Sequence, residues 1–182
     1  MNDIWVISDT HWHHANMLTF ITPDGRKVRP WLPEQVDEMD EYMVDRWNSV
    51  VKPQDKIYHL GDVAMDKKFI AIVGRCNGHK RLVRGNHDIH PIKLYLAVFD
   101  EVYATRWFED VIMSHIPLHP ESLGPKAVDR PRKWANIHGH VHNNVPQGHF
   151  GPVYYNVSVE MIDYTPVHID EVRKRLREQC AA

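Results

Sequence analysis

IWVISDTH, residues 4–11, is a short apolar run that passes directly into an aspartate and a histidine. An apolar run of this length is typical of a buried β-strand. Asp9 and His11 follow it with one residue between them, and this spacing sends both side chains to the same side of an extended segment. The stretch therefore predicts a strand that ends in two metal-binding residue types.

The same arrangement, an apolar run followed by polar residues with metal-binding or catalytic chemistry, recurs along the chain. The later occurrences are Gly61-Asp62, Gly85-Asn86-His87-Asp88, Ser114-His115 and Gly139-His140-Val141-His142. In open α/β sheets, ligands gather beyond the carboxyl ends of the strands. We therefore expect the five motifs to converge on one edge of the fold.

Hydrophobic periodicity predicts the elements between these motifs. Strands are expected at 4–7, 56–60, 81–83, 102–107, 111–113, 134–138, 153–157 and 167–169, and helices at 34–51, 67–73, 91–98 and 170–179. Early strands alternate with helices and later strands follow one another directly, which predicts an α/β protein with some antiparallel pairing. The whole chain, residues 1–182, is expected to form a single domain.

Composition excludes several classes of function. The net charge of −2 argues against binding along duplex nucleic acid, which needs clustered Lys and Arg. Two cysteines indicate a reducing compartment. The first residues do not resemble a signal peptide, and no apolar run approaches the roughly 18 residues of a membrane helix. We expect a cytoplasmic protein with no membrane partner; the sequence carries no signal for its oligomeric state.

The motifs together offer two carboxylates, one amide and four imidazoles as metal ligands. They are Asp9, Asp62, Asn86, His11, His115, His140 and His142. This mixture of nitrogen and oxygen suits divalent manganese, iron or zinc better than calcium or magnesium. Seven donors are too many for one tetrahedral site but suit two adjacent ions, which can activate water and clamp a phosphoryl group.

In this order and spacing, the five motifs resemble the calcineurin-like metallophosphoesterase superfamily. The resemblance covers residues 9–142 and implies a four-layer α/β/β/α sandwich with mixed sheets and a two-metal site at the sheet edges. It assigns Asp9, His11 and His142 to one metal, Asn86, His115 and His140 to the other, and Asp62 to a bridge between them. One departure is Ser114, where the superfamily often has glycine.

The resemblance further implies two catalytic residues. His87 faces the substrate and stabilises developing charge or protonates the leaving oxygen. Asp88 orients His87 through a hydrogen bond.

The function implied is two-metal hydrolysis of a phosphoester. The expected substrate is small, such as a nucleotide or cyclic nucleotide, and the enzyme is a phosphodiesterase or phosphatase. A hydroxide bridging the metals attacks phosphorus while His87 assists the leaving group. Manganese is the first expectation for both ions, ahead of iron, zinc or nickel.

Residues 12–33 are the main region expected to determine specificity. His14 and Arg29, with Arg26 and Lys27, are predicted to contact the substrate phosphate, since arginine suits bidentate phosphate binding. The alternative is that the charged residues are simply solvated on a loop, and the same choice applies to Arg130, Arg132 and Lys133. His13 is expected to be an exposed bystander.

Two other functions stay open at this point. A nuclease for single-stranded nucleic acid would need a basic groove lined by aromatic side chains, for which Trp12, Trp31 and Trp107 are available. A metal-dependent scaffold without catalysis would be expected to have lost ligands, and every expected ligand position is filled.

Overall fold

The computed structural model describes residues 2–124 and 135–181, so Arg130, Arg132 and Lys133 lie outside the described residues. The strands are β1 (Ile4–Ile7), β2 (Lys56–His59), β3 (His79–Val83), β4 (Glu101–Tyr103), β5 (Arg106–Phe108), β6 (Val111–Met113), β7 (Ala135–His138), β8 (Tyr154–Asn156) and β9 (Val167–His168). The α-helices are α1 (Val36–Val50), α2 (Ile92–Tyr95) and α3 (Ile169–Ala181). Shorter 3-10 helices are η1 (Ala15–Leu18), η2 (Pro33–Gln35), η3 (Lys67–Arg75), η4 (Pro120–Leu123) and η5 (Val159–Met161).

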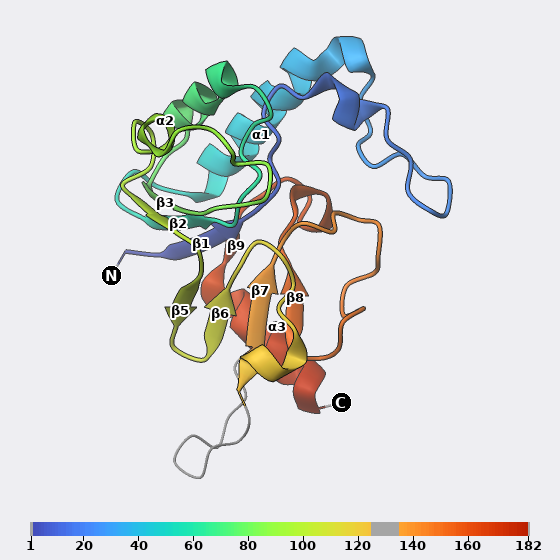
Figure 1. Cartoon of the computed structure of the whole chain (residues 1–182), viewed down its shortest axis with the longest axis vertical. Coiled ribbons are helices and arrows are strands. Elements are labelled where there is room, and N and C mark those ends of the chain that lie inside the picture. Colours follow the sequence, from blue (N-terminus) through green and yellow to red (C-terminus); the bar gives the residue numbers. More distant parts are fainter. Residues whose placement is uncertain (1, 125–134, 182) are drawn as a thin grey trace.

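Two mostly parallel sheets form the centre of the molecule. The first has the strand order β4-β3-β2-β1-β9, in which only β9 runs antiparallel to its neighbour. The second has the order β5-β6-β7-β8, in which only β5 is antiparallel. Figure 1 shows the first sheet above the second.

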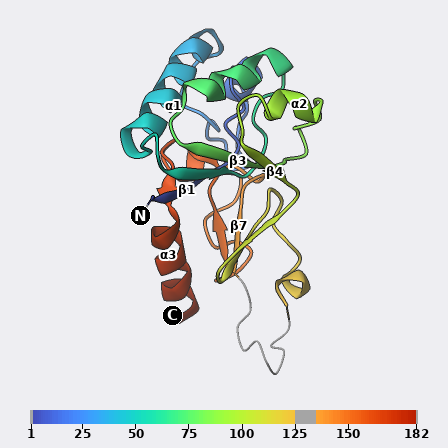
Figure 2. The same cartoon turned by 90° about the vertical axis from the view of Figure 1, so that its left-hand side faces the viewer.

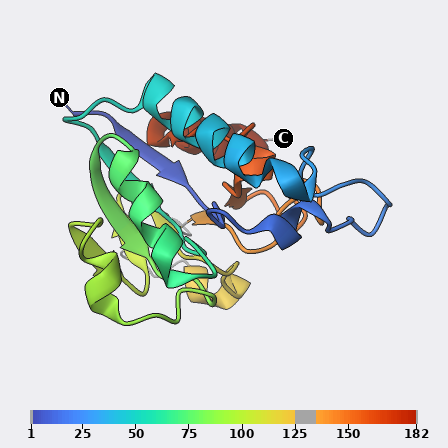
Figure 3. The same cartoon turned by 90° about the horizontal axis from the view of Figure 1, so that it is seen from above.

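Helices cover the outside of this pair of sheets. Helices α1, η3 and α2 lie over the first sheet (Figures 1 and 3), and α3 packs beside β1, β8 and β9 (Figure 2). The predicted α/β sandwich with mixed sheets is therefore confirmed.

Helix α1 shows why the sequence folds in this way. Met39, Met43 and Trp47 recur every fourth residue and are fully buried against the first sheet, as one face of an amphipathic helix should be. Asp37 and Glu38 lie in the first turn, where the helix dipole favours negative charge. Burial of one such large apolar side chain contributes about 1.5–3 kcal/mol, so the helix is fixed by packing.

Two predicted elements and one predicted strand pairing differ from the structure. The strand predicted at 102–107 is two strands in different sheets, because the chain crosses from one sheet to the other after Tyr103. The helix predicted at 67–73 is the 3-10 helix η3. Strands β6, β7 and β8 are parallel although no α-helix separates them along the described chain.

The two sheets are joined by hydrogen bonds at the carboxyl end of β1. The Ser8 N–H donates to the Val157 carbonyl of the second sheet (2.9 Å), and the Asp9 N–H donates to the Gly61 carbonyl of the first (2.9 Å). Segments that follow β1, β2 and β8 therefore meet at one point. This junction positions the polar motifs.

Candidate functional site

The five sequence motifs come together where the two sheets meet. Each follows the end of a strand, as the sequence predicts: β1, β2, β3, β6 and β7. Their side chains form two groups whose possible ligand atoms lie within 4.8 Å of one another: Asp9 with His11 and His142, and Asp62 with His115 and His140. Each group has the ligand types and spacing that could hold a metal ion.

The backbone at this junction adopts an unusual conformation. Asp9, His11, Asp62, His140 and His142 all have positive φ angles, between 45° and 71°. This left-handed region is uncommon for residues other than glycine and adds local strain. Five of the seven predicted ligands have this conformation, so the backbone is strained where these side chains point into the site.

Glycines allow two strand-end loops to approach closely. A Cβ atom at Gly139 would collide with the Asp9 carboxylate and the Ser8 hydroxyl, and one at Gly85 would collide with Asp62. Any larger residue at either position would push a predicted ligand out of place. The close approach of the loops therefore explains why both positions are glycine.

The first group is built around the buried carboxylate of Asp9. It accepts hydrogen bonds from the His140 N–H (2.9 Å) and the Ser158 hydroxyl (3.0 Å). Asp9 Oδ1 lies 3.8 Å from His142 Nε2. Ligand atoms around one ion at about 2.1 Å stand roughly 3–4 Å apart, so this spacing leaves room for a cation between them.

The second group centres on His115. Its Nε2 lies 3.3 Å from Asp62 Oδ2, 3.3 Å from His140 Nδ1 and 2.9 Å from Asn86 Oδ1. Four atoms able to ligate a metal thus converge within a few ångströms. Asn86 thus lies beside the group, and its role as an oxygen ligand stays a prediction.

Asp62 links the two groups. Its Oδ2 lies 3.6 Å from His11 Nε2 of the first group and 3.3 Å from His115 Nε2 of the second. Burial alone would raise the pKa of Asp62, but the contacts of its carboxylate with the His115 and His11 rings, and the His87 N–H that donates to Oδ1 (2.9 Å), hold it well below its usual range. The carboxylate is therefore charged and faces both groups.

The ring tautomers of two histidines suit metal binding. His115 Nδ1 lies 2.8 Å from the Leu60 carbonyl, which can only accept, so Nδ1 donates and the neutral ring turns the lone pair of Nε2 toward the group. His142 Nδ1 lies 3.0 Å from Glu160 Oε2 and is fixed in the same way. Metal-ligating histidines characteristically donate their other N–H to such acceptors.

The protonation of these rings and the carboxylates beside them also favour the binding of a cation. Burial lowers the pKa values of His11 and His140, which keeps both rings neutral as ligands must be. Burial acts in the same direction on His115 and His142, but the carboxylates of Asp62 and Glu160 respectively outweigh it and raise the pKa. The negative charge that attracts a proton there would also attract a metal. The donor set fits divalent metals.

Arg29 does not contact the pocket, so its prediction as a substrate contact is wrong. Its side chain is 0% exposed. The guanidinium donates to Glu160 Oε1 (2.7 Å), the Asp9 carbonyl (2.7 Å) and the Thr10 carbonyl (2.9 Å). Arg29 instead fixes the backbone of the loop that carries Asp9 and His11.

Glu160 is a residue that the sequence prediction missed. Its side chain is buried between Arg29 and His142. Burial would raise its pKa, but the positive charges of Arg29 and His142 lower it to about 2. Glu160 follows β8 as the predicted ligands follow their strands, so the strand-end rule, applied once more, could have found it.

Asp88 does not orient His87, which corrects the second predicted role. Its carboxylate accepts hydrogen bonds from the backbone N–H groups of Asp62 (2.9 Å), Val63 (2.9 Å) and Gly85 (2.8 Å). Asp88 thereby ties the loop after β2 to the loop after β3. The His87 ring is 45% exposed and reaches the site from its rim, with Nε2 4.0 Å from Asp62 Oδ2.

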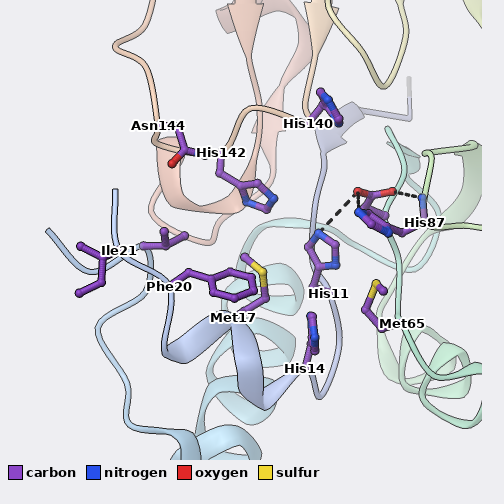
Figure 4. A pocket seen from close by; sticks show the side chains of 12 residues that line it. His11, His14, Met17, Phe20, Ile21, Met65, His87, His140, His142 and Asn144 are labelled. Atoms are coloured by element: carbon purple, nitrogen blue, oxygen red, sulfur yellow. Dashed lines mark hydrogen bonds and ion pairs between the residues drawn. The ribbon is translucent and has the colours of Figure 1, made fainter. Parts of the chain in front are cut away.

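A pocket of about 540 Å³ opens over both groups (Figure 4). Its lining is His11, His14, Met17, Phe20, Ile21, Val28, Asp62, Met65, His87, His140, His142 and Asn144. His14 therefore lies where the sequence prediction needs it, and burial lowers its pKa. Residues 12–33 supply the apolar side of the lining; their effect on specificity stays a prediction.

Three other sequence interpretations change. His13 is not an exposed bystander: its N–H and ring Nδ1 both bind the Asp40 carboxylate of α1, at 2.9 and 2.8 Å. Trp12 is completely buried, so it offers no stacking surface for nucleic acid, and Trp31 is partly buried with an edge-to-face contact on Tyr164. Trp107 is 53% exposed, but it lies on β5 and does not line the pocket.

Across the described ranges, no helix has the length and apolar character needed to cross a bilayer.

The fold and the site define an α/β sandwich protein with two adjacent metal-capable groups of aspartate and histidine. Its sequence is 31% identical to the uncharacterized protein MJ1445 of Methanocaldococcus jannaschii, over 98% of this chain and 93% of that protein. The chain belongs to the same family as MJ1445. It is also 28% identical to the Gene 66 protein of Mycobacterium phage L5, over 79% of each chain.

A solved structure supports the fold. The protein of unknown function AQ665 from Aquifex aeolicus superimposes with a TM-score of 0.68 and 26% identity, over 96% of this chain and 99% of its own. A novel archaeal phosphodiesterase gives a TM-score of 0.45 and 19% identity, over 86% and 82%; a likeness of that strength decides nothing about function. No family model matches the sequence.

Proposed function

We propose that this protein is a metal-dependent phosphoesterase that hydrolyses small phosphoesters, nucleotides among them, with two divalent ions. One ion would be held by Asp9, His11 and His142, and the other by Asn86, His115 and His140. Manganese is the first ion to test, with iron, zinc and nickel as the alternatives. The ordered motifs of the calcineurin-like metallophosphoesterase superfamily support the proposal from the side of the sequence.

The observation that carries the proposal is the position of Asp62. One of its oxygens, Oδ2, lies 3.6 Å from His11 Nε2 and 3.3 Å from His115 Nε2. A charged carboxylate oxygen shared in this way would offset the repulsion between two neighbouring dications. An isolated structural metal site has no need of such a shared oxygen.

When bound, paired divalent ions would activate a water and neutralise charge on the phosphoryl oxygens. The residues of the chain would supply the rest. His87, at the rim and partly exposed, would hold a proton near the leaving oxygen. Glu160 and Leu60 would keep two ligand rings in the required tautomer, and Asp88 would fix the loops that present Asp62 and His87.

The test combines turnover with metal content. With Mn(II), the wild-type protein should hydrolyse bis(4-nitrophenyl) phosphate or a member of a panel of 2′,3′-cyclic and 3′,5′-cyclic nucleotides and aryl phosphomonoesters. Asp62→Asn, which keeps the side-chain shape, should lose turnover and bind fewer ions by elemental analysis. Asp100→Asn is the matched control, because that aspartate is exposed and its Oδ2 lies 3.8 Å from Nδ1 of exposed His79. Retained turnover in Asp62→Asn would refute the proposal.

A further inference from the structure

One side of the pocket is apolar, and its residues come from residues 12–33. We define this surface as the apolar shelf: Met17, Phe20, Ile21 and Val28. Met17 and Val28 are buried, but Phe20 is 47% exposed and Ile21 62% exposed. Large apolar side chains exposed beside convergent polar groups are characteristic of ligand-binding surfaces.

The shelf has a fixed backbone. The Val28 N–H donates to the Phe20 carbonyl (2.9 Å), and the Thr22 N–H donates to the Arg26 carbonyl (2.7 Å), so these residues form a closed hairpin-like loop. Asn143, next to the predicted ligand His142, donates from its side chain to the Val28 carbonyl (3.1 Å). The loop is thereby tied to the metal-capable groups, which holds its exposed side chains in place beside them.

The shelf and His87 lie on opposite sides of His11. In Figure 4, Phe20 and Met17 lie on the side of His142, and His87 lies across from them. Four aromatic rings lie in a row between the two sides. The ring centroids of His87 and His11 are 5.8 Å apart, those of His11 and His14 5.8 Å, and those of His14 and Phe20 6.4 Å. A phosphorus atom over the two groups would therefore have His87 on one side and the shelf on the other.

From this arrangement we propose that the substrates are phosphodiesters whose retained ester group presents a flat ring to the shelf, either an aryl group or the nucleobase of a nucleoside. The inference rests on the proposed function. The leaving oxygen faces His87, so the leaving group points away from the shelf. A monoester has a single organic group, which would depart past His87 and leave the shelf empty; a diester fills both sides.

The hydrolysis is balanced by water alone. The water oxygen forms a bond to phosphorus, and the P–O bond on the His87 side breaks. The leaving oxygen departs as an alcohol or phenol with a proton that comes from the water; a weakly basic leaving group such as nitrophenolate departs as the anion, and that proton then goes to the solvent. The product that stays on the shelf is the phosphomonoester of the apolar group.

The experiment compares two substrates with one leaving group. Bis(4-nitrophenyl) phosphate retains an aryl group, whereas methyl 4-nitrophenyl phosphate retains only a methyl group. With Mn(II), Phe20→Ala should lower kcat/KM for the aryl diester about tenfold, through KM, and change it less than about twofold for the methyl diester. Ile21→Ser, at a more exposed position, should act in the same direction without risk to folding. Trp107→Ala is the control, an exposed aromatic residue outside the pocket.

A binding measurement separates the shelf from the reaction. Diphenylphosphinate and dimethylphosphinate are monoanions without an ester bond, and calorimetry with the Mn(II)-treated protein should show preference for the diphenyl compound that Phe20→Ala removes. If neither diester is hydrolysed but this preference is found, the proposed function fails and the shelf stands. If hydrolysis occurs and Phe20→Ala affects both diesters equally or not at all, the shelf is overturned and the proposed function stands. Equal binding of both phosphinates would also overturn the shelf.

Discussion

His142 Nδ1 lies 3.0 Å from Glu160 Oε2, and this contact fixes which nitrogen of the ring faces Asp9. The carboxylate is itself held by an ion pair between Arg29 Nε and Glu160 Oε1 at 2.7 Å. The predicted ligand His142 is thus oriented by Glu160, which is held in turn by Arg29. Such outer partners control ligand orientation and basicity.

The first prediction follows from this chain. Glu160→Gln should weaken the binding of Mn(II) to the Asp9 group about ten- to hundredfold, because the amide cannot supply the charge that polarises His142. Binding at the Asp62 group should change little. Equilibrium dialysis with metal analysis measures both, and Glu178→Gln on the exposed surface of α3 is the control. Unchanged affinity at both groups would mean that Glu160 only fills space.

A second prediction concerns Arg29, whose guanidinium satisfies a carboxylate and two carbonyls at once. Lysine has a single ammonium group and cannot reproduce this fork. Arg29→Lys should lower the free energy of unfolding by about 3 kcal/mol, as expected when a buried ion pair is disrupted. Urea denaturation measures it. Arg26→Lys, in the same loop but exposed, should have little effect; an unchanged stability with a raised KM would restore the substrate-contact interpretation.

Comparison with the sequence shows which site features are local. Asp9, His11 and the other predicted ligands were found because each follows an apolar strand, and parallel strands end at a common edge. The role of Arg29 could not be found in this way, because its partner Glu160 is 131 positions away and only the fold makes both buried. The predicted role of Asp88 is wrong for a related reason: its neighbour in sequence is His87, but its carboxylate accepts hydrogen bonds from backbone N–H groups of two loops.

The third prediction is a pH effect of His59, a fully buried residue of β2. Its Nδ1 accepts the Gly61 N–H (3.1 Å), and its Nε2 contacts the Thr10 hydroxyl (2.9 Å). Burial lowers its pKa from 6.5 to about 3. Between these pH values the unfolded chain binds a proton at His59 and the folded chain does not. The stability that neutral His59 contributes is therefore complete above pH 6.5 and is lost as the pH falls toward 3.

His59→Asn should reduce this dependence. Asparagine can still accept from Gly61 but does not titrate. Between pH 6 and 4, the slope of unfolding free energy against pH should be smaller in the variant by up to about 1.4 kcal/mol per pH unit. Denaturation series in EDTA, which removes any coupling to metal binding, measure the slope. Parallel pH profiles for the two proteins would contradict the prediction.

The last prediction tests His87 as the group that holds a proton for the leaving oxygen. Because its ring is 45% exposed at the rim, His87→Asn should fold normally and keep its metal content. A general acid contributes about 10²–10⁴-fold to the rate, and this help matters most when the leaving group is basic. With Mn(II), kcat for diphenyl phosphate should therefore fall by about a hundredfold or more, and kcat for bis(4-nitrophenyl) phosphate much less, since nitrophenolate departs without a proton. His79→Asn, an exposed histidine away from the pocket, is the matched control. Equal losses on both substrates would show instead that His87 stabilises charge on the phosphoryl group and does not protonate the leaving oxygen.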